Sequence, residues 1–170
     1  QRLNSLNLTG TGVAEVADDN SLDFGTGDFS VEAWVKYQFL SQGASSYNAI
    51  YTNGGIVNAT NNFSLTATTP NKIRFLVNNV RCTSTSTFTE GEWVHIVGSR
   101  ESGAIKLYIN GNTTPEATET DNNTVTNALV KMIGFDTNAE RYYNNLIDNV
   151  RVYDRALTTD EILQNYKAGL

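Results

Sequence analysis

Apolar and polar residues alternate in short runs along this chain, which is the pattern of β-strands with one buried face. In residues 29–36, Phe29, Val31, Ala33 and Val35 share one face of such a strand. Similar runs occupy residues 72–78, 92–99, 104–111, 130–135 and 146–154. This many short strands in 170 residues predict an all-β fold, built as two antiparallel sheets packed face to face.

One short helix is predicted near the end of the chain. Thr158 is a suitable N-cap, and Glu161 stands three residues later, which completes the capping-box pattern. Leu157 and Ile162 flank this cap at the spacing of a hydrophobic staple. We expect the helix to lie against the edge of the sandwich.

The length predicts a single domain over residues 1–170, because no linker and no fixed-period repeat divides the chain. The sequence begins with Gln1 instead of Met, so we expect it to be a fragment of a longer protein. Cys82 is the one cysteine, which excludes an intrachain disulfide. We interpret it as a half-buried structural thiol rather than a nucleophile.

The chain is acidic, with 12 Lys and Arg residues against 18 Asp and Glu residues. It has no basic stripe, so nucleic acid is not an expected partner. No apolar run approaches the roughly 20 residues of a membrane span, so membrane insertion is not expected. The acidity suits cation binding, although a solvated surface explains it as well.

Asp148 stands out in the run LIDNVRVYD at residues 146–154. Strict alternation places it on the same face as Leu146, Val150 and Val152, which predicts that its carboxylate points inward. A buried carboxylate is costly unless it is hydrogen-bonded, paired or bound to a metal. Backbone donors, an arginine such as Arg155, and a cation therefore remain open as its partners.

Three stretches together resemble the laminin-G-like, concanavalin A-like jelly rolls. They are DNSLDFGTGDFSVEAWVK, GEWVHIVGSRESGAIKLYINGN and LIDNVRVYDRALTTDEI, in the family's order and spacing. Two positions depart from the usual pattern, at residues 93–96 (WVHI) and 143–145 (YNN). The resemblance implies a two-sheet antiparallel jelly-roll sandwich with one short C-terminal helix, and it specifies no ligand.

The resemblance also implies a structural calcium ion. Lichenase-type β-glucanases share the jelly roll, and an aspartate on a similar last strand binds calcium together with backbone carbonyls. Their second ligand region is a glycine turn before an early strand, which looks like Gly25–Asp28 here. Asp148 and Gly27 are therefore the expected calcium ligands, since calcium prefers carboxylate and carbonyl oxygens.

A second metal site is predicted in the loop GFDTNAERYYNN. Asp136, Asn138 and Glu140 place oxygen atoms at every second residue, the spacing with which calcium loops wrap an ion. In the related pentraxins, calcium lies in rim loops, and the matching loop precedes the same last strand. The alternative is a solvated loop without a metal.

The same loop and a second one, SQGASSYNAIYTNGG, are candidates for binding a glycan. A sugar presents apolar C–H faces and hydroxyl edges, so its site needs aromatic rings beside polar groups. If the two loops meet on one rim, they would supply the following side chains: Tyr47, Tyr51, Asn53, Arg141 and Tyr142. Trp34 is a further aromatic candidate, but we expect it to pack between layers.

Catalytic chemistry is not evident in the sequence. Glycoside hydrolysis needs two carboxylates beside the scissile bond. The nearest match to the sandwich-glucanase motif is Glu119-Thr120-Asp121, which lacks the last acid. His95 is the one histidine, and its apolar strand favours a packed, hydrogen-bonded core residue over a triad member.

These observations favour a non-catalytic carbohydrate-binding or adhesion module of a larger secreted or surface protein. A structural or interaction domain of a phage or virion surface protein, without a sugar site, is one alternative. A glycan hydrolase or lyase with an unrecognised site is another. The expected location is extracellular, at the cell surface or at a virion surface.

Overall fold

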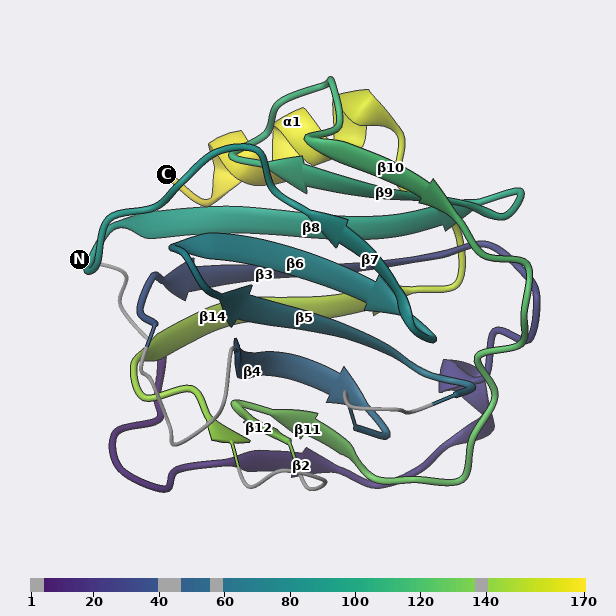
Figure 1. Ribbon diagram of the computed structural model, residues 1–170, viewed down its shortest axis with the longest axis horizontal. Coiled ribbons are helices and arrows are strands. Elements are labelled where there is room, and N and C mark those ends of the chain that lie inside the picture. The colour runs from purple at the N-terminus through teal and green to yellow at the C-terminus, as the bar shows by residue number, and fades with distance from the viewer. Residues whose placement is uncertain (1–4, 40–46, 56–59, 137–140) are drawn as a thin grey trace.

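The computed structural model describes residues 5–39, 47–55, 60–136 and 141–170, and shows two six-stranded antiparallel sheets packed face to face (Figure 1). Sheet A runs in the order β1 (Leu6–Asn7), β14 (Leu146–Tyr153), β3 (Phe29–Lys36), β8 (Trp93–Glu101), β9 (Ala104–Ile109) and β10 (Ala117–Thr120). Sheet B runs in the order β2 (Ala14–Val16), β11 (Lys131–Ile133), β4 (Tyr47–Asn53), β5 (Phe63–Thr68), β6 (Lys72–Val77) and β7 (Val80–Thr83).

Three smaller elements complete the described fold. A short ribbon pairs β12 (Phe135–Asp136) with β13 (Arg141–Tyr142), and a 3-10 helix, η1, spans Asn20–Leu22. The helix α1 (Thr159–Ala168) lies near the C-terminus. The predicted all-β jelly-roll sandwich with one short C-terminal helix is therefore confirmed.

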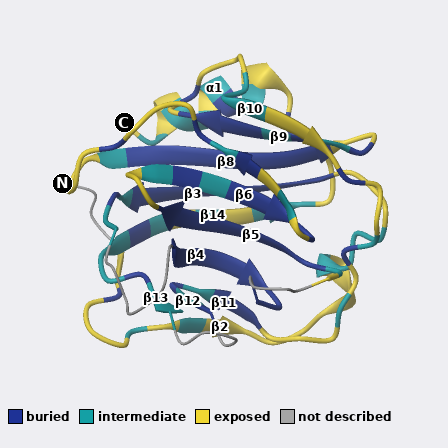
Figure 2. Ribbon diagram, in the orientation of Figure 1, coloured by how far each residue is buried: buried dark blue, intermediate teal, exposed yellow. Residues whose placement is uncertain are grey.

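The core lies between the two sheets, and the strands β3, β4, β5 and β8 are buried along nearly their whole length (Figure 2). The predicted inward face of β3 is confirmed, because Phe29, Val31, Ala33 and Val35 are all completely buried in this core. The sheets approach closely at Gly98, where an added Cβ would come within 2.4 Å of the Phe75 ring. Only glycine fits there without a shift of the opposite sheet.

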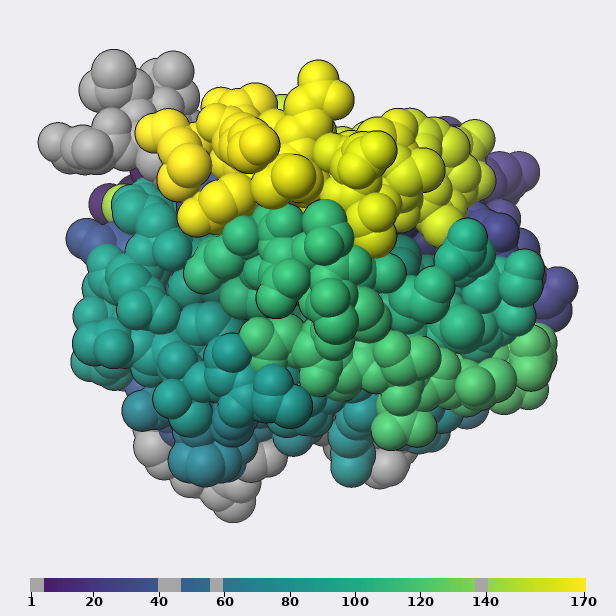
Figure 3. Space-filling view, turned by 90° about the horizontal axis from the view of Figure 1, so that it is seen from above, coloured from purple at the N-terminus to yellow at the C-terminus, as the bar shows by residue number. Residues whose placement is uncertain are grey.

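The outer face of sheet A is covered by α1, which forms one side of the molecule (Figure 3, yellow). Leu157 and Ile162 pack there with residues of β8 and β9, as the predicted hydrophobic staple requires. The capping box is also confirmed, since the Thr158 hydroxyl and the Glu161 side chain accept hydrogen bonds from each other's backbone N–H groups.

Trp34 packs between layers as predicted. Its ring stacks on Tyr166 of α1 with centroids 5.5 Å apart, and only 4% of the residue is exposed. His95 lies beside it, with ring centroids 5.1 Å apart. The prediction of a packed histidine holds, but that of a hydrogen-bonded one was wrong. Within the described residues, neither ring nitrogen has a hydrogen-bond partner, and the nearest Glu32 oxygen is 3.7 Å from Nε2.

Glu32 anchors a polar network beneath α1. Its carboxylate accepts hydrogen bonds from Arg151 at 2.6 Å, from Asn165 at 2.9 Å and from Tyr153 at 3.3 Å. Burial disfavours the charged form, but His95 and the donors Asn165 and Arg151 outweigh it and hold the pKa of Glu32 below its ordinary value. The network ties the helix to β3 and β14.

Candidate functional site

Asp148 does not point into the core, which corrects the prediction from alternation. Ile147 is 1% exposed and belongs to the core, so its neighbour Asp148 faces the opposite side. The strand then bulges at Asn149, which has a φ of 50°, and Val150 packs inward again. The bulge reverses the alternation. Asp148 pairs in register with Trp34 and is half-buried on the outer face of sheet A.

Gly27 and Asp148 do not form one calcium site. Gly27 lies two residues before the start of β3, whereas Asp148 pairs with Trp34 near the other end of that strand. Trp34 lies five positions after Phe29, which is about 17 Å at roughly 3.3 Å per residue. The two expected ligands are therefore much too far apart to share an ion, whose ligands lie about 2.4 Å away.

A guanidinium group already occupies the glycine turn. The completely buried Arg100 donates to the Gly27 carbonyl at 2.9 and 2.7 Å and to the Gly25 carbonyl at 2.7 Å. It also donates to the Asn123 carbonyl at 2.9 Å. A cationic side chain thus neutralises the carbonyl dipoles for which a calcium ligand role was expected. No local pattern of the sequence predicts this arrangement.

The structure does bring part of the predicted rim together. The Tyr47 hydroxyl donates to Asp136 at 3.1 Å, and the Arg141 guanidinium lies 4.0 Å above the centre of the Tyr47 ring. Asp136 and Arg141 face each other across the β12–β13 ribbon. Burial and the Asp136 carboxylate raise the pKa of Tyr47, so its hydroxyl stays protonated. Asn138 and Glu140 lie outside the described residues.

Tyr142 occupies the other side of the same ribbon. Its ring packs against Phe135 with centroids 4.6 Å apart, and both residues are half-buried. Directly opposite residues share a face, so Tyr142 and Phe135 alternate with the Asp136–Arg141 pair. Tyr142 is therefore a partly exposed aromatic surface next to the rim, as predicted, but does not share a face with Arg141.

Tyr51 and Asn53 are not rim residues, which corrects two of the predicted contacts. Tyr51 is 3% exposed and packs in the core against Phe63. The register of β4 shifts between Ala49 and Tyr51, which turns this ring inward. Asn53 is completely buried six residues beyond Tyr47, about 20 Å along the strand, and accepts a hydrogen bond from Asn127.

The outer face of sheet B carries polar groups that the sequence analysis missed. Along β5, Phe63, Leu65 and Ala67 belong to the core, so Ser64 and Thr66 face outward. Ser64 is 1% exposed and Thr66 is completely buried, yet neither hydroxyl has a hydrogen-bond partner within the described chain. The alternation of Ser and Thr with apolar residues in FSLTAT was the available signal.

Thr66 lies close to the rim. In register it stands between Ala49 of β4 and Arg74 of β6, and Tyr47 faces Thr68 in the next row of the same face. Tyr47, Ala49 and Leu76 form a small apolar cluster there. The outer face of sheet B thus joins the Tyr47–Asp136–Arg141 rim to two buried hydroxyls and a guanidinium.

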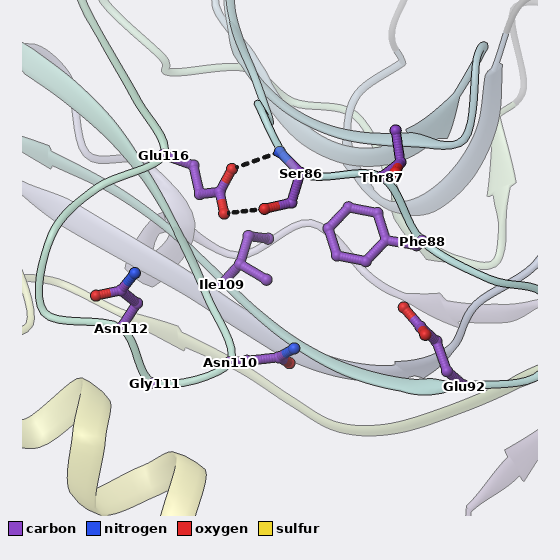
Figure 4. Close-up of a pocket in the computed structure, with 9 residues that line it drawn as sticks. All are labelled: Ser86, Thr87, Phe88, Glu92, Ile109, Asn110, Gly111, Asn112 and Glu116. Carbon is purple, nitrogen blue, oxygen red and sulfur yellow. Dashed lines mark hydrogen bonds between the residues drawn. The ribbon is translucent and has the colours of Figure 1, made fainter.

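A separate pocket of about 550 Å³ lies near the β9–β10 connection (Figure 4). Its lining combines Phe88 with Glu92, Asn110 and Asn112, but Phe88 is only 5% exposed. The Glu116 carboxylate accepts four hydrogen bonds from the backbone and hydroxyl groups of residues 85 and 86. The Glu116 carboxylate of this pocket is therefore already satisfied, unlike the hydroxyls on sheet B.

The two acids of the weak glucanase match have different surroundings. Asp121 is 4% exposed and accepts hydrogen bonds from Asn78 and from Asn123, while Glu119 is exposed on β10. Within residues 5–39, 47–55, 60–136 and 141–170, no group of three His, Cys, Asp or Glu side chains gathers as a metal site.

Cys82 is completely buried, more deeply than predicted. Its thiol donates to the Ile105 carbonyl at 3.3 Å, and burial raises its pKa to about 12. A thiol with so high a pKa is not a nucleophile at neutral pH, which agrees with the structural interpretation. In the described part of the chain, no helix is long and apolar enough to cross a membrane.

Comparison with solved structures shows the same fold in several proteins. The binding domain of Paraclostridial Mosquitocidal Protein 1 matches with a TM-score of 0.72 and 16% identity, over 96% of this chain and 42% of that one. Domain 4 of AbnA, a GH43 extracellular arabinanase from Geobacillus stearothermophilus in complex with arabinotriose, matches with a TM-score of 0.68 and 20% identity. That match covers 94% of this chain and 75% of the other.

Trypanosoma rangeli sialidase matches with a TM-score of 0.60 and 18% identity, over 83% of this chain and 22% of the enzyme. This chain thus spans less than half of the mosquitocidal and sialidase chains. No curated protein sequence matches it. The sequence family described as the concanavalin A-like lectin/glucanases superfamily matches residues 8–163, and the chain belongs to that superfamily.

Proposed function

We propose that this domain is a non-catalytic carbohydrate-binding module of a larger secreted or surface protein, and that its ligand lies over the outer face of sheet B. The observation that carries the proposal is the pair of buried hydroxyls, Ser64 Oγ and Thr66 Oγ1, without partners in the described chain. A buried polar group without a hydrogen bond costs about 1–3 kcal/mol. A face that keeps two of them is suited to a ligand, or ordered water, that supplies the missing bonds.

A saccharide has the chemistry that such a face requires. Each sugar hydroxyl donates one hydrogen bond and accepts others, so it can pair with Ser and Thr hydroxyls in either sense. The neighbouring Arg141 and Tyr47 add a fixed donor and an amphipathic ring. The half-buried pair of Tyr142 and Phe135 offers apolar surface for C–H faces nearby.

The relatives in fold support this choice. AbnA domain 4 has the same architecture and was solved with a trisaccharide, and the mosquitocidal protein uses the fold in a binding domain. At 16–20% identity these matches establish the shared fold, so the step to carbohydrate binding in this chain is our proposal. An extracellular or surface location is proposed on the same basis.

The absence of catalysis is proposed from the acids of this face. Hydrolysis by the usual route needs two carboxylates on either side of the scissile bond. Among the described residues of β4–β7, β12 and β13, Asp136 is the one acid, and it is held by the Tyr47 hydroxyl. We therefore expect no release of reducing sugar from any polysaccharide that binds.

The test is a glycan array, followed by isothermal titration of each hit with matched variants. Thr66→Val keeps the shape of the side chain and removes the hydroxyl, so we expect affinity to fall about tenfold, the equivalent of one hydrogen bond. Thr118→Val is the control, because Thr118 is exposed on β10 of sheet A. Equal affinity of Thr66→Val and the parent for every hit would show that the ligand lies elsewhere.

A further inference from the structure

The strands around the candidate face reverse the charge balance of the protein. The whole chain has 12 basic and 18 acidic residues. By contrast, β4–β7, β12 and β13 together contain four basic residues and one acidic residue, Asp136. The basic residues are Lys72, Arg74, Arg81 and Arg141. An acidic protein has therefore gathered cations on one part of its surface.

Strand register places the three cations of β6 and β7 on the outer face. Ile73, Phe75 and Val77 belong to the core, so Lys72 and Arg74 point away from it. On β7, Cys82 is in the core, which turns Arg81 outward. Thr66 pairs directly with Arg74, and Ser64 lies in the same row as Leu76 and Arg81. Each unpartnered hydroxyl therefore shares a row with a guanidinium.

Arg74 and Arg81 differ from most of the other described arginines in lacking a carboxylate partner. Arg100, Arg151 and Arg155 each lie within 4 Å of an acidic side chain. In the described chain, neither Arg74 nor Arg81 forms an ion pair. Arg74 Nε instead donates a hydrogen bond to an uncharged group, the Thr83 hydroxyl, at 3.2 Å.

The two guanidinium groups also repel each other. Arg74 is half-buried, and both its burial and the nearby charge of Arg81 lower its pKa. Two like charges on adjacent strands destabilise a sheet unless an anion lies between or above them. Guanidinium groups bind carboxylate and sulfate oxygens in a bidentate geometry, which makes such anions the matching ligands.

We propose that the outer face of sheet B selects acidic saccharides, in which Arg74 and Arg81 bind a carboxylate or sulfate group and Ser64 and Thr66 bind adjacent sugar hydroxyls. This inference rests on the proposed function, because it specifies the class of glycan that the same face takes. Arg141 at the rim extends the positive charge along the ligand. Lys72 continues it on β6.

The experiment compares four probes with the intact domain by affinity electrophoresis and isothermal titration. The probes are polygalacturonate for carboxylates, heparin for sulfates, linear arabinan as a neutral polymer, and a single-stranded oligonucleotide as a non-saccharide polyanion. We expect one acidic polysaccharide to bind at least about tenfold more tightly than arabinan. Raising salt from about 0.1 to 1 M, which shortens the Debye length from about 10 to 3 Å, should weaken that binding strongly.

Matched arginine variants locate the effect. Arg74→Gln and Arg81→Gln should each lower affinity for the acidic polysaccharide about tenfold or more, which would remove its advantage over linear arabinan. Arg155→Gln is the control, since Arg155 pairs with Glu161 beside α1 on the far side of sheet A. Melting curves of all three variants establish that each is folded.

The outcomes separate the two proposals. Equal binding of neutral and acidic glycans, lost in Thr66→Val but kept in Arg81→Gln, would overturn the acidic selectivity and leave the proposed function standing. Tighter binding of the oligonucleotide than of either acidic polysaccharide, with the same arginine dependence, would overturn it as well. Absence of binding to any glycan, on this panel and on an array, would overturn both.

Discussion

The outer faces of the two sheets begin from similar sequence patterns and are completed differently. On sheet A, the outward residues of β3 are Ser30, Glu32 and Trp34, and α1 covers them. The Ser30 hydroxyl accepts the Leu157 N–H at 2.9 Å, and the Glu32 carboxylate has three donors. On sheet B, Ser64 and Thr66 are as deeply buried and have no such partners in the described residues.

The difference shows how burial alone misleads about function. Both faces carry buried polar side chains, but the described residues supply hydrogen-bond partners for Ser30 and Glu32 on sheet A and none for Ser64 on sheet B. A polar face completed by its own helix contributes stability, whereas one left unsatisfied costs stability and is retained where something else binds.

Removing the aromatic contact between sheet A and α1 should cause the largest loss of stability. Trp34→Ala deletes the ring that stacks on Tyr166 and packs against His95, so we expect the free energy of unfolding to fall by about 3–5 kcal/mol. Denaturation in urea measures it. A loss below about 1 kcal/mol would mean that α1 is not an integral cover of this face.

Calcium binding distinguishes the two sheets, because the rim residue Asp136 lies beside sheet B and Asp148 lies on sheet A. We expect calcium to stabilise the domain through the rim loop, by about 2.7 kcal/mol at a hundredfold excess over the Kd. Asp136→Asn should abolish the fall in melting temperature caused by a chelator, whereas Asp148→Asn should preserve it. The reverse pattern would place the ion at Asp148, and no chelator effect in the parent would exclude both sites.

Low pH should lower the stability of the protein, because protonation weakens the interactions of Glu32 on the outer face of sheet A. Its pKa is lowered in the folded protein, so its contribution is present above the unfolded value of about 4.3 and is lost as pH falls through the folded value. Glu32→Gln should remove that part of the stability, about 1–3 kcal/mol at neutral pH. Unfolding curves of both proteins between pH 7 and 3 should converge towards low pH; parallel curves would contradict the assignment.

The smallest expected effect on stability comes from comparing Ser30 on the outer face of sheet A with Ser64 on that of sheet B. Ser30→Ala leaves the buried Leu157 N–H without its acceptor and should cost about 1–2 kcal/mol. Ser64→Ala removes a hydroxyl that has no partner in the described chain, so its stability should be unchanged or slightly higher. Equal losses in the two variants would show that Ser64 is satisfied within the protein, and would remove the main support for a ligand on that face.

Much of the fold was predictable from the sequence because alternation over long strands is a strong signal. β3 begins and ends at the predicted residues, with the predicted face inward, and the capping box located α1. These features depend on residues close together in the chain. Local patterns therefore sufficed for them.

Two of the wrong predictions involve shifts of strand register. Asp148 was assigned to a face by counting residues, and Tyr51 was expected in a rim loop, but each lies on a strand at such a shift. A bulge inserts one residue and reverses every later side chain, which counting does not detect. The positive φ of Asn149 is compatible with its residue type, but Asn is common in this chain and marked no particular position.

The other features that could not be predicted from the sequence depend on contacts between residues far apart in the chain. Arg100 reaches carbonyls more than 70 residues earlier in the chain, so the sequence could not show that it occupies the glycine turn. The meeting of Tyr47 with Arg141 was a condition of the predicted rim, and the structure fulfils it. The cationic rows of β6 and β7 depend on strand order and became visible only with the sheet assembled.

The central claim is that the outer face of sheet B is the ligand-binding face. A titration of the ¹⁵N-labelled domain with its best-binding glycan, followed by amide chemical shifts, tests it most directly. We expect the shifts to concentrate in β4–β7 and at the β12–β13 rim, with Thr66 and Arg74 among the most affected residues. Shifts confined to α1 and the strands of sheet A, or to the pocket around Phe88, would contradict the account.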